Sequence, residues 1–193
     1  MLYDLPVTAD FAGRSWALRT DFRDVLTVLE AYEDPELTEE EKVWVCLAVM
    51  YPDYGDIPRR HLAEAYAAAM DFIDGGAPAR GSGRVMDWRQ DAPILFPAVN
   101  RVAGREVRAL DYMHWWTFLG CFMEIREGTF ATVLSLRQKK RRGKKLEPAE
   151  REFWQANRDL CELKPRRAPE EAAERQRLNA VLGRGEMRVE SEE

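Results

Sequence analysis

The segment HWWTFLGCFMEIREGTF, residues 114–130, restricts the possible folds of this chain more than any other stretch. It places two tryptophans, three phenylalanines, a cysteine and a methionine within seventeen residues. The segment is too short for a membrane anchor, because Asp111 and Glu124 leave only twelve residues between charges, whereas a helix needs about 20 residues to span a bilayer. Its aromatic side chains therefore pack inside the protein or against a partner.

The spacing of these side chains predicts a helix, which we expect to run from Leu110 to Arg126. At 100° per residue, its apolar side chains cover more than half of the circumference, which is wider than the stripe of a surface helix. Such a helix is contacted on two sides. Either both sides belong to the core, or one side forms an open groove for an apolar partner, where tryptophan, phenylalanine and methionine are favoured contacts. The candidate groove residues are Trp115, Trp116, Phe122 and Met123.

The N-terminal residues 2–19 follow a different period. Apolar and polar side chains alternate on both sides of Ala12–Gly13, and a period of two with a glycine at the tip predicts a small β-hairpin. A lone hairpin is only marginally stable in water. We therefore expect it to pack against the rest of the chain.

From Thr20 onward the apolar period is that of helices. In the second of them, Thr38 and Glu41 have the spacing of a capping box, and Trp44 is expected on its buried stripe. Two prolines lie within the helical pattern further along. Pro93 can be accommodated in the first turn of a helix, whereas Pro97 would kink it.

The fold class predicted from this pattern is mainly α. We expect a single helical domain, residues 1–164, of six or seven helices with the hairpin packed on it. The helical patterns cover residues 20–34, 37–51, 58–74, 87–104, 110–126, 130–143 and 148–163.

Two segments are expected to be flexible. Residues 75–84, GGAPARGSGR, contain four glycines and no large apolar side chain, which is typical of a flexible loop. After Pro165 the chain carries six arginines and seven glutamates with few sizeable apolar residues. Such a composition cannot force docking onto a core, so we predict a charged, mobile tail over residues 165–193.

The sequence offers no pattern for catalysis or for a bound cofactor. His61 and His114 lack a second ligand at the spacing of a zinc site, and no phosphate-binding loop or G-x-S-x-G motif is present. Cys46, Cys121 and Cys161 are odd in number and far apart, which indicates free thiols in a reducing compartment. Burial among aromatic side chains would make Cys121 inert even beside His114. We expect no enzymatic activity, no metal and no cofactor.

The most conspicuous charged feature is RQKKRRGKK, residues 137–145, with seven basic side chains in nine residues. Three interpretations are open: a solvated helix end whose cations complement the helix dipole, a docking site for a protein, or a patch for nucleic acid. The net charge of −5 gives no general attraction to nucleic acid, and no aromatic side chains interleave with the run. The basic residues concerned are Arg137, Lys139, Lys140, Arg141, Arg142, Lys144 and Lys145.

Six segments, taken in order, resemble the bacteriophage gene-product-fifteen family. They are YDLP, TDFRDVL, EEEK, DWRQDAPILFPAVNRV, HWWTFLGCFMEI and RQKKRRGKKLEPAEREFWQANRDL, and the resemblance covers roughly residues 1–163. Members of that family are regarded as small tail assembly chaperones of tailed phages and prophages. The resemblance brings no catalytic residue with it.

The function implied by this resemblance is that of a tail assembly chaperone, which binds the tape-measure protein and keeps it soluble. Another tail assembly chaperone is a second candidate partner. The N-terminus, MLYDLPVTAD, has neither the basic nor the apolar region of a signal peptide, and we expect the protein in the cytoplasm of the bacterial host, with no membrane contact. The alternatives are a structural tail component and an accessory nucleic-acid-binding protein that uses the basic run.

Overall fold

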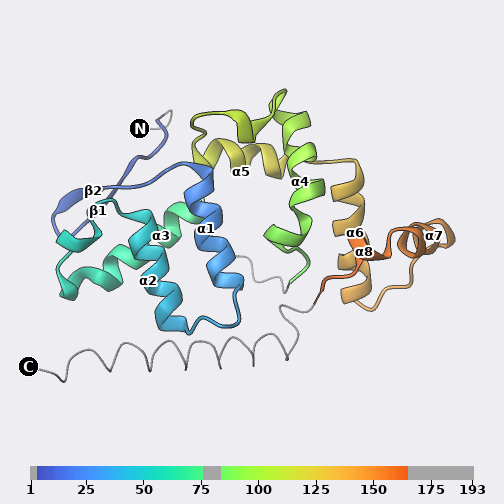
Figure 1. Ribbon diagram of the computed structural model, residues 1–193, viewed down its shortest axis with the longest axis horizontal. Coiled ribbons are helices and arrows are strands. Elements are labelled where there is room, and N and C mark those ends of the chain that lie inside the picture. The colour runs from blue at the N-terminus through green and yellow to red at the C-terminus, as the bar shows by residue number, and fades with distance from the viewer. Residues whose placement is uncertain (1–3, 76–83, 165–193) are drawn as a thin grey trace, which may run out of the picture. The chain divides into compact units, whose positions relative to one another are not determined.

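The computed structural model describes residues 4–75 and 84–164 (Figure 1). The chain divides into two compact units, Met1–Leu163 and Lys164–Glu193, and only Lys164 of the second unit is among the described residues. Of the predicted flexible loop 75–84, only Gly75 and Arg84 are described. The predicted tail 165–193 lies outside the described residues, so both of these remain predictions.

The predicted N-terminal hairpin is confirmed. Strand β1, Thr8–Phe11, pairs antiparallel with β2, Arg14–Ala17. Ala12 and Gly13 both have positive φ, 53° and 76°, as the two central residues of a type I′ turn require. The hairpin buries one face, on which Phe11 stacks on Trp16 with ring centroids 5.3 Å apart, and β1 packs against α3.

Three helices follow, and each begins where local chemistry allows it. In α1, Phe22–Glu33, the carboxylate of Asp21 caps the first turn by accepting the N–H of Arg23. In α2, Glu39–Met50, Thr38 and Glu41 form the predicted capping box. Helix α3, Leu62–Ile73, begins later than Pro58, because short 3-10 turns η1, Tyr54–Asp56, and η2, Arg59–His61, come first.

Helix α4, Trp88–Ala103, contains both prolines in its interior. Pro93 does not lie in the first turn, because Asp87 caps the helix through the N–H of Gln90 and the helix therefore begins at Trp88. The helix ends at Gly104, whose φ of 70° is left-handed, the usual conformation of a glycine at a helix C-terminus.

The aromatic helix α5, Trp115–Met123, is shorter than the predicted range 110–126. After the 3-10 turn η3, Val107–Ala109, the chain bonds instead to the start of α1. The N–H of Met113 donates to the Asp21 carboxylate over 3.0 Å, and His114 pairs with Asp21 in a β-bridge. These bonds keep the segment before Trp115 extended.

The last described elements are α6, Thr129–Arg141, α7, Pro148–Ala156, and α8, Arg158–Cys161. The pattern over 148–163 predicted one helix, but Asn157 adopts φ −123° and ψ 41° and separates two. The described residues therefore form eight α-helices rather than six or seven. The mainly α fold with an N-terminal hairpin is as predicted.

The buried side chains form a large cluster and a small one. The large cluster joins the hairpin, α1 to α5 and the start of α6, and within it Phe22 and Phe118 stack 4.7 Å apart. The small cluster holds α8 on α6 and consists of Val133, Leu136 and Cys161. Ile94 of α4 packs against both clusters and so connects them.

Candidate functional site

Trp115, the first candidate groove residue, lies in the interior. Trp115 is only 2% exposed. Its indole N–H donates to the carbonyl oxygen of Ile73 over 2.8 Å, and its ring stacks on Phe118. A buried tryptophan with its polar atom paired is a satisfied core residue. Trp115 therefore does not line an open groove.

Two further candidates, Trp116 and Phe122, are half-buried. Trp116 donates its indole N–H to the carbonyl of Phe72 over 2.8 Å and stacks on the ring of that residue. Phe122 contacts the rings of Trp88 and Phe130, with centroids 5.6 and 5.9 Å away. Both sides of α5 therefore help to hold other elements together.

Met123 is the one candidate on α5 that is largely exposed. It is 67% exposed and is the last residue of the helix. The structure thus divides the four predicted groove residues into one core residue, two half-buried packing residues and one surface residue.

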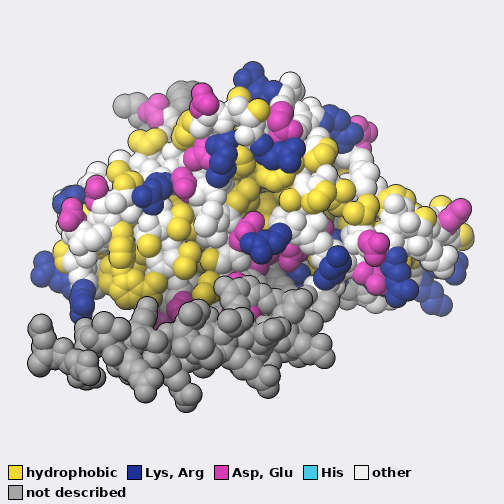
Figure 2. Space-filling model, in the orientation of Figure 1, with side chains coloured by type: hydrophobic (Ala, Val, Ile, Leu, Met, Phe, Trp, Pro, Cys, Tyr) yellow, Lys and Arg dark blue, Asp and Glu magenta, His cyan; other side chains and the backbone are white. Residues whose placement is uncertain are grey.

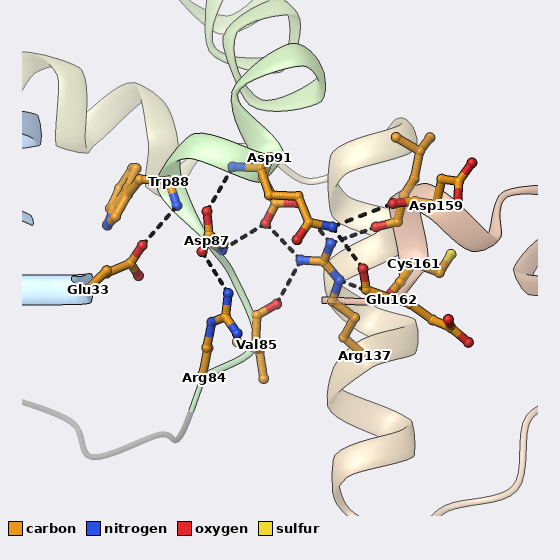
Figure 3. A network of polar contacts seen from close by, with 12 residues as sticks. Glu33, Arg84, Val85, Asp87, Trp88, Asp91, Arg137, Asp159, Cys161 and Glu162 are labelled. Atoms are coloured by element: carbon orange, nitrogen blue, oxygen red, sulfur yellow. Dashed lines mark hydrogen bonds and ion pairs between the residues drawn. The ribbon is translucent and has the colours of Figure 1, made fainter. Parts of the chain in front are cut away.

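The basic run is divided in a similar way, since Arg137 is 5% exposed. Figure 3 shows its guanidinium at the centre of a network of polar contacts. Its two terminal nitrogens donate to both carboxylate oxygens of Asp91 over 2.7 and 2.8 Å. The remaining donors reach the carbonyl oxygens of Cys161, Val85 and Leu160. All five N–H donors of the guanidinium are used, so this side chain connects α4, α6 and α8 and does not face a partner.

The other cations of the run lie at or beyond the end of α6. Lys139 forms an ion pair with Glu150, and the ammonium group of Lys140 lies over the ring of Trp154, 4.0 Å from its centroid. Gly143 has a left-handed φ of 67°, and the backbone bonds around it close a Schellman motif. The exposed members are Lys140, Arg141, Arg142, Lys144 and Lys145.

A surface that the sequence pattern did not predict lies on α2. Trp44, expected on the buried stripe, is 50% exposed, and its ring meets Tyr54 edge to face at 5.7 Å. The buried side of this helix is formed by Leu47 and Met50, which the same stripe predicts, and by Cys46. Figure 2 shows hydrophobic side chains gathered on the face of the molecule near α2 and α3. The sequence does contain a feature that indicates an exposed apolar face. In the run VWVCLAVM, residues 43–50, every side chain is apolar, which is more than one buried helix face requires.

Both ends of α2 are held by specific bonds. At the N-terminus, Glu41 accepts the backbone N–H of Thr38 over 2.7 Å. At the C-terminus, the guanidinium of Arg19 donates to the carbonyl oxygens of Ala48 and Val49 over 3.0 and 2.8 Å. The exposed face around Trp44 is therefore presented by a helix that is held at both ends.

The thiols and the buried histidine show no activated group. Burial raises the pKa of Cys46 to about 12, and burial also raises the pKa of Cys121 and Cys161. His114 accepts the N–H of Trp116 at Nδ1 over 3.0 Å and donates from Nε2 to the carbonyl of Pro6 over 2.9 Å. Both ring nitrogens thus act in capping α5 and in holding the N-terminal arm.

A pocket of about 360 Å³ lies between α4 and the start of α6. Its walls include Pro93, Pro97 and Phe130, and its one charged residue is Arg101. The guanidinium of Arg101 donates to the carbonyl of Glu127. A ligand site usually combines apolar walls with several convergent polar groups, and this pocket lacks that combination.

The described residues contain neither a metal-binding group nor a membrane-spanning helix. Over residues 4–75 and 84–164, no three histidine, cysteine, aspartate or glutamate residues gather as a metal-binding group. Over the same residues, no helix has both the length and the apolarity needed to cross a membrane.

The comparison with known families is specific. The family described as Bacteriophage Gp15 protein matches residues 2–163, which is most of the chain and nearly all of its described part. No curated protein and no solved structure matched the chain. This chain belongs to the bacteriophage Gp15 protein family.

Proposed function

We propose that this member of the bacteriophage Gp15 family is a tail assembly chaperone, which binds the tape-measure protein in the host cytoplasm and keeps it soluble. The observation that supports the proposal most is the family match over residues 2–163. The exposed apolar face of α2 around Trp44 is consistent with it, because exposed tryptophan is a favoured anchor of protein contacts.

The physical requirement on such a chaperone is moderate affinity. A long helical tape-measure chain exposes apolar stripes until tail-tube subunits enclose it, and those stripes would otherwise aggregate. A protein that covers them at repeated sites shifts the equilibrium towards the soluble state by mass action, and many weak contacts add up through effective concentration. Release then needs only competition by the tube subunits, without ATP.

The direct test is co-expression of the tape-measure protein from the same phage with and without this protein. We expect the tape-measure protein to be soluble and to co-purify only in the presence of the chaperone, and the chaperone to be scarce in finished particles. If the tape-measure protein is equally soluble alone and nothing co-purifies, the proposal is wrong. Stoichiometric abundance in particles, measured by mass spectrometry, would favour a structural tail component instead.

The proposal includes no enzymatic activity. Two arrangements support this part: the thiols have raised pKa values, and both nitrogens of His114 are engaged in backbone bonds. A single-turnover reaction abolished by Cys121→Ala or His114→Ala, in variants with an unchanged free energy of unfolding, would overturn it.

Nucleic-acid binding by the basic run is the weaker alternative. Arg137 is committed to Asp91 and Lys139 is paired with Glu150, which leaves fewer cations for phosphates. We expect no duplex binding near physiological ionic strength. A micromolar complex at that salt concentration, with the steep salt dependence of counterion release, would favour the alternative.

A further inference from the structure

We propose that the partner docks on the exposed face of α2 around Trp44, and that the docking segment is an amphipathic helix with basic residues beside its apolar stripe. The inference rests on the proposed chaperone function and adds to it the surface and the chemical class of the segment bound. Neither α5 nor the basic run is the main contact in this account.

Trp44 is both exposed and held in place. Half of its surface is accessible, although residues 43–50 of α2 are all apolar. The edge-to-face contact with Tyr54 restricts the indole, and the bonds at both ends of α2 restrict the helix. A preordered aromatic side chain loses little conformational entropy on binding, which suits it to anchor a partner.

Among the described residues, the other large apolar side chains that are exposed lie outside α2. Leu5 and Val7 lie together on the arm before β1, outside any helix, whereas Met123, Tyr112 and Val102 lie on separate segments. The hydroxyl group of Tyr112 is bonded to Thr20 over 2.7 Å. Single exposed apolar residues are normal on a protein surface. On α2, by contrast, the exposed Ala48 lies one turn along from Trp44, and the half-buried Val45 is in turn a neighbour of Ala48 at a spacing of three residues.

The charged residues around Trp44 on α2 are mainly acidic. Glu40 and Glu41 lie one turn before Trp44 on α2, and both are exposed. Between residues 39 and 56 there are five acidic residues and one lysine, and that lysine, Lys42, is mostly buried and pairs with Glu39. Other cations are Arg19, whose guanidinium lies at the C-terminal end of α2, and Arg59 and Arg60, which lie in η2. The charge of α2 and η1 is therefore negative, which is complementary to a segment with basic flanks.

The mode of binding that fits these observations is helix-in-groove recognition, in which a few apolar anchors carry the affinity and the flanking charges select the partner. A regular apolar stripe on the partner helix would cover Trp44, Val45 and Ala48. Its basic side chains would reach the carboxylates at the start of α2.

The test uses two fluorescently labelled synthetic helices of equal length with the same leucine stripe, one flanked by lysines and the other by glutamates. Binding to the full chain is measured by fluorescence anisotropy. We expect the lysine-flanked peptide to bind at least tenfold more tightly than the glutamate-flanked one. Trp44→Ala should weaken its binding by tenfold or more, whereas the matched control Met123→Ala should change it less than twofold. Thermal unfolding verifies that both variants are folded.

Equal affinity for the two peptides would overturn the proposal that the docking segment is basic. Unchanged binding by the Trp44→Ala variant would overturn the proposal that the segment docks on α2. Light scattering addresses a second copy of the chain as occupant: a dimer that Trp44→Ala converts to a monomer would also overturn the proposal. Co-expression with the tape-measure protein distinguishes a failure of the proposed docking surface from a failure of the proposed chaperone function. If wild-type and Trp44→Ala proteins solubilise the tape-measure protein equally well, the docking surface is wrong and the chaperone function stands. If neither does so, the chaperone function is wrong.

Discussion

Helices α5 and α2 both carry long apolar runs, yet their tryptophans have opposite environments. Helix α5 packs against α4 and α1, and the indoles of Trp115 and Trp116 donate to carbonyls at the end of α3. Helix α2 packs against α1 and α3, which leaves Trp44 half-exposed. The breadth of an apolar surface shows how much of a helix can be covered, whereas the neighbouring elements decide which part is covered.

The largest expected effect contrasts the two helices through stability. Trp115→Ala should lower the free energy of unfolding by about 4 kcal/mol, because it removes a large buried side chain and leaves a cavity. Trp44→Ala should lower it by no more than about 1 kcal/mol, since the side chain is half-exposed and contacts mainly Tyr54. Chemical denaturation measures both values. Equal losses would show that Trp44 is also a core residue.

The second expected effect tests the same contrast within the basic run. Asp91→Ala or Arg137→Ala alone should cost about 3–5 kcal/mol, because each leaves an uncompensated buried charge. The exposed control Arg142→Ala should stay within about 0.5 kcal/mol. Replacing both partners together, by Asp91→Leu and Arg137→Met, should recover most of the loss. A single variant as stable as the Arg142 control would contradict the buried position of the pair.

A third effect concerns how α2 is held. Thr38→Ala removes the hydroxyl group that accepts the N–H of Glu41, and loss of such a cap costs about 1 kcal/mol. Thr27→Ala is a suitable control, because its hydroxyl group is exposed and bonds within the helix to the carbonyl of Arg23. Hydrogen exchange at the start of α2 should become faster in the first variant. An unchanged rate there would show that packing alone holds this end.

The smallest effect is chemical and needs no loss of stability. The cysteines of the two helices have the reverse order of their tryptophans: Cys46 on α2 is fully buried, and Cys121 on α5 is partly exposed. Near pH 8 a thiol reagent should modify Cys121 first and Cys46 only on unfolding. The pKa of Cys46, raised by burial to about 12, means that the folded chain retains a proton that the unfolded chain releases above about pH 8.5.

It follows that this contribution of Cys46 to stability is complete below about pH 8.5 and is lost as the pH rises towards 12. Cys46→Ala should flatten that part of the pH dependence, whatever its effect on packing at neutral pH. Rapid modification of Cys46 in the folded protein at pH 8 would contradict the buried environment of its thiol.

Local patterns predicted the elements of this fold well and their contacts less well. The hairpin turn at Ala12–Gly13 and the capping box of Thr38 depend on neighbouring residues, and both are present. The N-terminal boundary of α5, at Trp115 rather than Leu110, depends on Asp21. This residue is far away in the sequence and holds Met113 and His114 in extended conformation. No pattern near residue 110 contains that information.

The candidate site was harder to predict for the same reason. Arg137 looked like one cation among seven, and its carboxylate partner Asp91 is 46 residues away. Trp44 fitted a buried stripe by periodicity, but the two neighbours of α2 cover the side with Cys46 and Leu47 and leave Trp44 half-exposed. Whether a side chain is exposed depends on how the elements pack together. A single sequence predicts exposure only for a helix that has one apolar side.

The most direct test of the account is photo-crosslinking at helices α2 and α5 during co-expression with the tape-measure protein. A photo-reactive phenylalanine derivative replaces either Trp44 on α2 or Met123, the exposed end of α5. The account predicts a crosslink to the tape-measure protein from position 44 and none from position 123. A crosslink from position 123 alone, with position 44 silent while the tape-measure protein still co-purifies, would contradict it.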